Sequence, residues 1–487
     1  MSATVELVRR WDVPACEAWV RRLFGIADDL EDAYERLHGI ESRLAGWRGP
    51  AAAQALPRVR RAVLAVSTLA GTVRQVAQAV CSGLAGFAGA VRLARAVTQS
   101  PAELTEAAVT ARSVDRRVAT ALAAVAPARG VAMPNPAWTP AEVAAWWTTL
   151  PPDRRRLALS RRPALLGALA GLPAAVRDAA NRLQLSRLLA SLRAERDRMR
   201  AAGFPAVPPE LRWVGERVGS QLAIAETVAR VLAAHEHREP VARLLTLDLE
   251  GAGRVAIGLG DVDRARHVAV VVPGMGQDAR HGVERTVAAA DRLLRQAEGE
   301  STAGTAVLAW VGYAAPGWAQ VPFPTRALAG GRGLAADLRA LAAGRTVDGG
   351  DPPHLTVIGH SYGSTVVGAA ATTQPLIADD LVLLGSPGAM AEHTDQLSRP
   401  RGHVFVGEAR FDLVADLGAF GADPGDPRFG ATRIRADPGP EVPWPERVSG
   451  GDHSHYFDTD SESLRNVARV VVGRGAEVTL MDSEGER

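Results

Sequence analysis

One five-residue turn constrains the fold of this chain more than any other feature. Residues 359–363 read Gly-His-Ser-Tyr-Gly, between an apolar run at 355–358 and a stretch rich in small residues at 364–371. The apolar run predicts a buried strand, and the small residues predict a helix packed closely on it. An abrupt strand-to-helix turn holds its serine in a strained backbone conformation, and glycine on either side lets helix and strand approach. We therefore expect the Ser361 hydroxyl to project beyond the end of a strand, although a plain glycine-rich turn has the same pattern.

The chain after residue 240 alternates short β-rich runs with helical patterns, which predicts a mostly parallel sheet covered by helices. The predicted strands are 244–249, 254–259, 267–272, 306–312, 355–359, 381–384, 403–406 and, less clearly marked, 432–435. The predicted helices are 283–296, 326–343, 363–373 and 462–472. Because residues 251–253 form a short Gly-Ala-Gly connection, the first two strands are expected to form a hairpin ahead of the parallel part.

The first part of the chain has a helical pattern. Apolar residues recur at three-and-four spacing over residues 15–126, with few β-branched runs. A break is expected at 47–50, Trp-Arg-Gly-Pro, where the glycine can end one helix and the proline can begin the next, giving a helical hairpin. A second break falls at 133–136, Met-Pro-Asn-Pro, and residues 139–142, Thr-Pro-Ala-Glu, then have the sequence of a capping box.

The length predicts two or three domains, since 487 residues exceed one ordinary hydrophobic core. We expect a helical hairpin or bundle at 1–130, a helical linker or lid region at 131–240, an α/β domain at 241–475 and a C-terminal tail at 476–487. The fold class is therefore α/β, with an all-α region preceding a mostly parallel sheet.

Composition is that of a globular protein and excludes few functions. Hydrophobic residues make up 47% and charged residues 23%, which is too apolar for a disordered chain. The formal net charge of +2 gives no support to nucleic-acid binding. Cys16 and Cys81 lie in helical segments, where we expect inert buried or half-buried thiols or, alternatively, one bridge between helices.

Neither a secretory signal peptide nor a membrane span is expected. Asp12 and Pro14 stand where a signal peptide needs its apolar run. The longest apolar stretch, 62–94, is interrupted by polar residues that include Arg74 and Arg92, so it lacks the uninterrupted run of about 20 residues that spans a bilayer. The chain is therefore expected to be cytoplasmic, without an integral membrane segment.

A serine hydroxyl becomes a good nucleophile when a histidine takes its proton and a carboxylate orients that histidine. At a turn of this type the chain order is serine, acid, histidine. Asp412 lies in a loop beyond the C-terminal end of the strand 403–406, where such an acid belongs. Glu408, Asp416 and the reading of Asp412 as a plain solvated carboxylate remain alternatives.

The candidate bases are the two late histidines, His453 and His455, which lie in one loop before the last predicted helix. Spacing does not separate them, and we favour His453. His360, which immediately precedes the serine, and His393 are weaker candidates.

The oxyanion that forms when a serine attacks a carbonyl needs fixed hydrogen-bond donors. The backbone amide of Tyr362, directly after the serine, is expected to be the first. The second is expected from the glycine-containing segment 273–277, Pro-Gly-Met-Gly-Gln, at Met275 or Gly276. A simple turn at the end of a strand is the alternative for this segment.

Metal and cofactor signatures are missing from the sequence. The histidines lack the His-Glu-x-x-His spacing, no cysteine pair exists, and Gly258-Leu259-Gly260 lacks the third glycine and the helix of a dinucleotide loop. No cofactor and no metal is therefore expected.

The motifs together resemble an actinobacterial α/β-hydrolase family of unknown function, in which a helical region precedes the hydrolase domain. The resemblance covers most of the chain and is carried by residues 272–276, 310–313, 359–364, 384–388, 429–431 and 453–457, and upstream by 146–147, 171–173, 177–178 and Asn181. It implies an α/β-hydrolase fold and a serine hydrolase of ester or related acyl bonds, with a small-molecule or lipid ester as substrate. The family usually has threonine at the position of Met275 and a small residue at the position of His455.

A second resemblance concerns the first hundred residues. The Trp47-Arg48-Gly49 sequence between two helices is similar to the Trp-x-Gly helical hairpins exported by type VII secretion, although the Tyr-x-x-x-acid export signal is not met at Tyr34. This resemblance implies an alternative function, an interaction or effector protein whose helical half binds a helical partner. It also implies an alternative, non-classical route of export. A tryptophan that anchors the packing of a hairpin has the same pattern.

Overall fold

The structure is a computed structural model of the whole chain. It describes all residues except 1–5, 7, 45–49, 97–100, 126–132, 135–137, 202–211, 240, 318–322, 346–350, 374, 399–402, 411, 413, 416–417, 438–450 and 482–487. The chain divides into two compact units, of which the first comprises residues 1–138 and 189–222 and the second comprises 139–188 and 223–487. The predicted linker or lid region, 131–240, is therefore shared between the two units.

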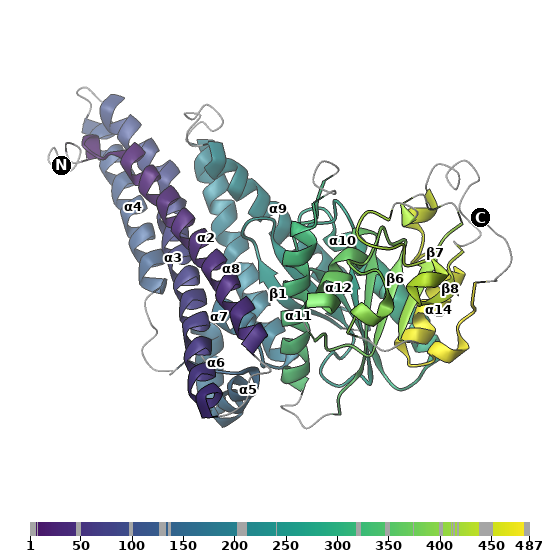
Figure 1. Cartoon of the computed structure of the whole chain (residues 1–487). Helices are drawn as coiled ribbons and strands as arrows, with labels where there is room; N and C mark the ends of the chain where they lie inside the picture. Colours follow the sequence, from purple (N-terminus) through teal and green to yellow (C-terminus); the bar gives the residue numbers. More distant parts are fainter. Residues whose placement is uncertain are drawn as a thin grey trace. The chain divides into compact units, whose positions relative to one another are not determined.

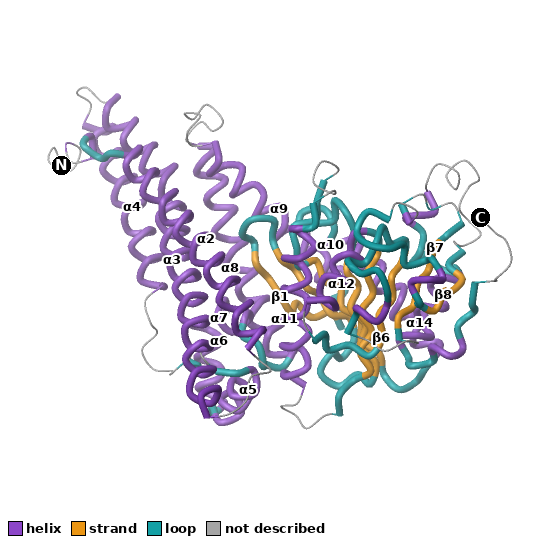
Figure 2. The backbone as a smooth tube through the Cα atoms, viewed as in Figure 1, coloured by secondary structure: helices purple, strands orange, loops and turns teal. Residues whose placement is uncertain are grey.

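The first unit is helical (Figures 1 and 2). It contains α2 (Val13–Leu44), α3 (Pro50–Ala96) and α4 (Pro101–Val125), together with the second part of α8 (Ala174–Ala201) and the first part of α9 (Arg212–Ala234). Helix α3 packs against both α2 and α4. Arg74 of α3 forms ion pairs with Asp28 and Glu31 of α2, at 2.8 and 2.7 Å. The predicted break at 47–50 falls between α2 and α3, with residues 45–49 outside the described residues.

One stretch of the first unit, Leu69–Ala96 in α3, is long and apolar enough to cross a membrane by length and composition. Half of its most apolar window is buried within the structure, and the core helix of a bundle passes the same test. Among the described residues no other helix meets these criteria.

The second unit is built on a mixed, mostly parallel sheet. Among the described residues the sheet has eight strands in the order β1-β2-β4-β3-β5-β6-β7-β8. The strands are β1 (Ala242–Asp248), β2 (Arg254–Leu259), β3 (His267–Val272), β4 (Thr305–Val311), β5 (His354–His360), β6 (Asp380–Leu384), β7 (Val404–Glu408) and β8 (Thr432–Arg435). Strand β2 pairs antiparallel with β1 and β4, and the strands from β4 to β8 pair in parallel.

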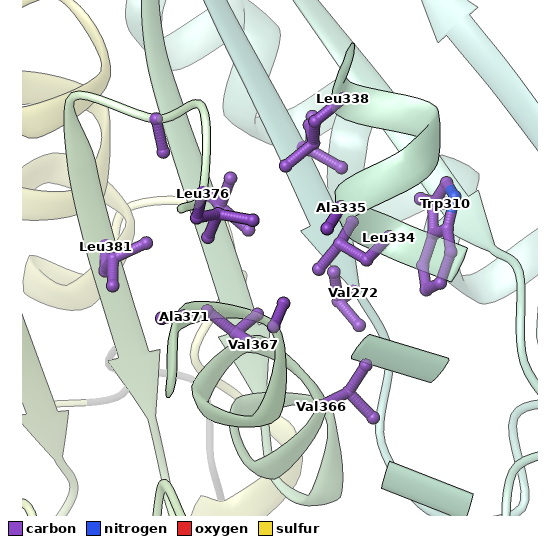
Figure 3. Packing of buried hydrophobic residues seen from close by; sticks show 14 of the residues in the cluster. Val272, Trp310, Leu334, Ala335, Leu338, Val366, Val367, Ala371, Leu376 and Leu381 are labelled. Carbon is purple, nitrogen blue, oxygen red and sulfur yellow. The ribbon is translucent and has the colours of Figure 1, made fainter. Parts of the chain in front are cut away.

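Helices cover both faces of this sheet. Helices α11 (Thr325–Arg345) and α12 (Tyr362–Thr373) pack on each other over one face (Figure 3). The core there is formed by Leu334 and Leu338 of α11, Val366 of α12 and strand residues such as Val272 and Trp310. Helices α10 (Val283–Glu300) and α14 (Glu462–Val471) pack together against the sheet as well. The short helices α5 (Pro140–Thr149), α6 (Pro152–Arg161) and α7 (Pro163–Ala168) precede α8.

The secondary-structure predictions for the second unit are confirmed. All eight predicted strands exist, with ends that differ by at most two residues, and the first two form the expected antiparallel hairpin. The capping box of α5 is also present, because the Thr139 hydroxyl accepts from the Glu142 amide and the Glu142 carboxylate accepts from the Thr139 amide. The expectation for Cys16 is wrong: Cys81 is buried, but Cys16 lies on an exposed position of α2, and neither forms a disulfide.

Candidate active site

The turn at Ser361 joins β5 to α12 in the strained conformation that the sequence predicts. Ser361 has a φ of +55°, which non-glycine residues rarely adopt. A Cβ atom at Gly359 would lie 2.5 Å from Cα of Ser364, and one at Gly363 would lie 2.3 Å from the carbonyl oxygen of Val272. The two glycines therefore let α12 start directly against the ends of β5 and β3.

The parallel register brings the loops that follow these strands to one edge of the sheet. Val272 of β3 is paired with Gly359 of β5, and His360 is paired with Leu384 of β6. The Ser361 amide donates to the carbonyl of Leu384 at 2.9 Å. Residues that follow the carboxyl ends of β3, β5, β6 and β7 can therefore meet here, as is usual for sites in parallel sheets.

His453 joins Ser361 to Asp412. Its Nε2 lies 2.8 Å from the Ser361 hydroxyl oxygen, and its Nδ1 lies 2.8 Å from both carboxylate oxygens of Asp412. An ionised carboxylate only accepts hydrogen bonds, so Nδ1 carries the proton and the lone pair of Nε2 faces the serine hydroxyl. The structure thus brings together three residues that are 41 and 92 positions apart in the sequence.

The carboxylate of Asp412 is buried, with 3% of the residue exposed. Burial alone raises the pKa of Asp412, but hydrogen bonds from His453, Tyr456 and the Val414 amide outweigh it and hold the pKa below its ordinary value. The Tyr456 hydroxyl donates to Oδ2 at 2.6 Å and accepts from the Ala409 amide at 3.0 Å. Asp412 is therefore a stable anion beneath His453.

Replacing Tyr456 with phenylalanine is expected to lower the free energy of unfolding at neutral pH by about 1–3 kcal/mol, because a buried hydrogen bond to a charged group is lost. A depressed pKa contributes stability that is present above the unfolded value and is lost as the pH falls through the folded value. The difference in the free energy of unfolding between the wild type and Tyr456→Phe should therefore become smaller at acidic pH. Urea unfolding across a pH series measures this, and a difference that stays constant down to the acid transition would contradict the assignment.

His360 supports the site through the His453 loop. Among the described residues its side chain forms no hydrogen bond with Ser361. Its Nε2 donates to the carbonyl oxygen of His453 at 2.7 Å, and the two rings lie 5.0 Å apart. Loss of hydration, together with the nearby His453, lowers the pKa of His360 to about 4. His360 is therefore neutral near pH 7 and fixes the backbone of the His453 loop.

The other candidate residues that the structure describes have different partners. His455 Nδ1 contacts the carboxylate of Asp458 in its own loop. His393 caps the short helix Thr394–Gln396. Glu408 ends β7, and Asp416 lies outside the described residues. Of the alternatives left open by the sequence, the structure thus places His453 and Asp412 at the serine.

The segment after β3 lies directly against the serine. A Cβ atom at Gly274 would be 2.7 Å from Cβ and 3.1 Å from Oγ of Ser361. The Gly276 amide donates to the carbonyl of Pro316 at 3.1 Å, so it is already used. No hydrogen bond from the amides of Met275 or Tyr362 is found among the described residues. Met275 is therefore the better placed of the two predicted donors.

Tyr456 and Tyr313 were not singled out as functional from the sequence, and His360 was named only as a weaker candidate for the base. Tyr456 and His360 hold Asp412 and His453, as described above, and Tyr313 binds the segment after β3. All three stand in or next to the motifs that carry the family resemblance, which was the available signal. A metal site is not found, since no three histidine, cysteine, aspartate or glutamate residues gather suitably within the described part of the chain.

Comparisons with known proteins match the sequence of this chain to a family. A family model described as "Alpha/beta hydrolase" matches residues 248–422. An uncharacterized protein of Mycobacterium bovis, Mb0988c, is 33% identical over 223 residues, which cover 42% of this chain and 80% of that protein. The chain belongs to the α/β-hydrolase family. Its helical first unit and its mostly parallel sheet agree with the architecture that the sequence predicts.

Two other similarities of this α/β-hydrolase cover a larger share of the chain. The uncharacterized protein Rv2079 of Mycobacterium tuberculosis is 31% identical over 389 residues, which cover 72% of this chain but only 58% of that protein. The chain thus spans little more than half the length of this relative. An esterase of Pyrobaculum calidifontis is similar over 55% of this chain and 98% of its own, with 12% identity and a TM-score of 0.32. Similarity at that level says nothing about activity.

Proposed function

We propose that the chain is a serine hydrolase that acts on an ester or related acyl bond through Ser361, His453 and Asp412. The observation that carries the proposal is the continuous hydrogen-bond chain from the serine hydroxyl through His453 to the buried Asp412 carboxylate. Membership of the α/β-hydrolase family supports it. The strained serine at the end of β5 supports it further, because such a turn holds the nucleophile beyond the edge of the sheet.

The proposed reaction has two acyl-transfer steps. Oγ of Ser361 attacks the carbonyl carbon while its proton passes to Nε2 of His453, and the electron pair of the carbonyl bond moves onto oxygen. The Asp412 carboxylate stabilises the imidazolium ion. Collapse of the tetrahedral intermediate breaks the ester bond, and the departing alkoxide takes the proton from His453. Water, deprotonated by His453, then attacks the acyl-enzyme and releases the carboxylic acid together with free Ser361.

The oxyanion of each tetrahedral intermediate is proposed to bind the amides of Tyr362 and Met275. The Tyr362 amide lies in the Ser361 turn, and the Met275 amide lies in the segment that packs against that turn. Neither amide has an acceptor among the described hydrogen bonds. Amides fixed in this way favour the transition state because they need no reorganisation when charge develops.

Ser361→Ala tests the proposal. The variant is expected to lose both turnover of a short p-nitrophenyl ester and covalent labelling by a fluorophosphonate, because it lacks the attacking oxygen. Mass spectrometry of the labelled wild type should place the adduct on Ser361. Ser398→Ala is the matched control, since that hydroxyl donates to the carbonyl of Ala371 and accepts from the amide of Leu376, neither of which belongs to the proposed machinery, and the change should leave both readouts intact. Turnover or labelling that persists in Ser361→Ala would overturn the proposed function.

A further inference from the structure

Tyr313 follows β4 and reaches the segment that lies against Ser361. Its hydroxyl donates to the carbonyl oxygen of Pro273 at 2.7 Å and is 3.3 Å from that of Gly274. The residue is 4% exposed, so these bonds form away from solvent. The last residue of β3 is Val272, which means that Tyr313 holds the first two peptide groups of the loop.

The geometry of the peptide bond passes this restraint to the Met275 amide. In a planar trans peptide the N–H points opposite to the C=O. The carbonyl of Gly274 and the amide of Met275 belong to one peptide group, and the carbonyl faces the Tyr313 hydroxyl. The Met275 N–H therefore faces away from Tyr313, while the Cα of Gly274 in the same segment packs on Ser361.

Packing fixes the Tyr313 ring. It stacks on Trp310 and on Tyr362, with ring centroids 6.3 Å apart in both pairs and planes inclined by 12° and 14°. The indole of Trp310 donates to Asp337 of α11 at 2.8 Å, which fixes the outer end of the stack. The stacked rings of Trp310, Tyr313 and Tyr362 thus contact the Met275 segment through the Tyr313 hydroxyl. The same stack includes Tyr362, whose amide is the other proposed oxyanion donor.

The hydroxyl keeps its proton over the range in which an ester hydrolase is assayed. Burial, together with the neighbouring Tyr362, raises the pKa of Tyr313 well above its ordinary value of 10. Its role as a donor to the loop carbonyls is therefore constant with pH.

We propose that Tyr313 is a positioning residue, which orients the Met275 amide toward the oxyanion by holding the carbonyls of Pro273 and Gly274. This inference rests on the proposed function. It assigns no bond-making step to Tyr313, which acts on the reaction only through the loop backbone.

Tyr313→Phe tests the inference because it removes the hydroxyl and keeps the stacked ring. Complete loss of an oxyanion donor lowers kcat about 10²–10³-fold, so a donor that is present but misoriented should cost roughly 10–100-fold, with little change in KM. A matched pair of ester and thionoester substrates adds a specific readout. Sulfur is a poor hydrogen-bond acceptor, so the preference of the wild type for the ester should shrink in the variant.

Two further variants separate positioning from a general loss of stability. Incorporation of 4-aminophenylalanine at position 313 restores an N–H donor and should recover most of the ester preference. Thr365→Val removes another buried hydroxyl, which donates to the carbonyl of Gly388 at 2.9 Å, and should leave the preference unchanged. If the phenylalanine variant does not fold, 4-fluorophenylalanine at position 313 takes its place as the ring without a donor.

The outcomes distinguish this inference from the proposed function. Activity that persists in Ser361→Ala removes the proposed function. Activity that depends on Ser361 but keeps the wild-type kcat and ester preference in Tyr313→Phe overturns the role of Tyr313 alone. A loss of kcat and of the ester preference, rescued by 4-aminophenylalanine, supports the inference.

Discussion

His453→Ala is expected to lower kcat for a short p-nitrophenyl ester by roughly 10³–10⁶-fold, while the chain remains folded. The reason is that Nε2 of His453 is the acceptor placed 2.8 Å from the Ser361 hydroxyl, and without it the serine keeps its proton. Fluorophosphonate labelling should slow by a comparable factor. Steady-state kinetics and the rate of labelling measure the effect, with circular dichroism to verify folding.

His455→Ala is the matched control, because it removes the other histidine of the same loop. His455 contacts Asp458 rather than Ser361, so kcat should stay within about threefold of the wild type, as is common for a site outside the reacting groups. If activity is lost in His455→Ala and kept in His453→Ala, the proposed base is wrong.

Gly363→Ala is expected to have the second largest effect. The added Cβ would lie 2.3 Å from the carbonyl oxygen of Val272 and 2.6 Å from that of Pro273, and backbone atoms cannot rotate away. Helix α12 must therefore shift from the end of β3, which moves Ser361 and the Met275 segment apart. We expect the free energy of unfolding to fall by about 1–3 kcal/mol, and turnover of the ester to fall more than 100-fold where the protein still folds.

Gly333→Ala provides the comparison within a neighbouring helix. A Cβ there would meet Trp310 at 3.8 Å, an ordinary contact, and alanine is favoured over glycine in a helix by about 0.5–1 kcal/mol. This variant should be as stable as the wild type or more so, with unchanged turnover. Chemical unfolding and ester kinetics of the two variants give the comparison, and equal behaviour of Gly363→Ala and Gly333→Ala would refute the packing argument.

The fold of the second unit could be predicted well because its signals are local. Strand β3 has the predicted bounds, His267–Val272. A strand that is buried on both faces is a continuous apolar run, so its composition alone distinguishes it from the polar residues around it. The turn at Ser361 was predictable for the same reason: its strain, its two glycines and its flanking elements all lie within about twenty residues. The first unit gave weaker signals, and the break at 47–50 falls partly outside the described residues.

The sequence by itself determined the order of strands and helices, the position of the serine turn and the loops from which a base and an acid had to come. Only the tertiary structure decided that His453 rather than His455 faces Ser361, and that the Gly276 amide is already bound to Pro316. It alone joined Tyr313 to the segment after β3, and Tyr456 to Asp412. The physical reason is that an element forms from neighbours in the chain. A site forms from side chains 40 to 93 residues apart, which the register of a parallel sheet brings to one edge.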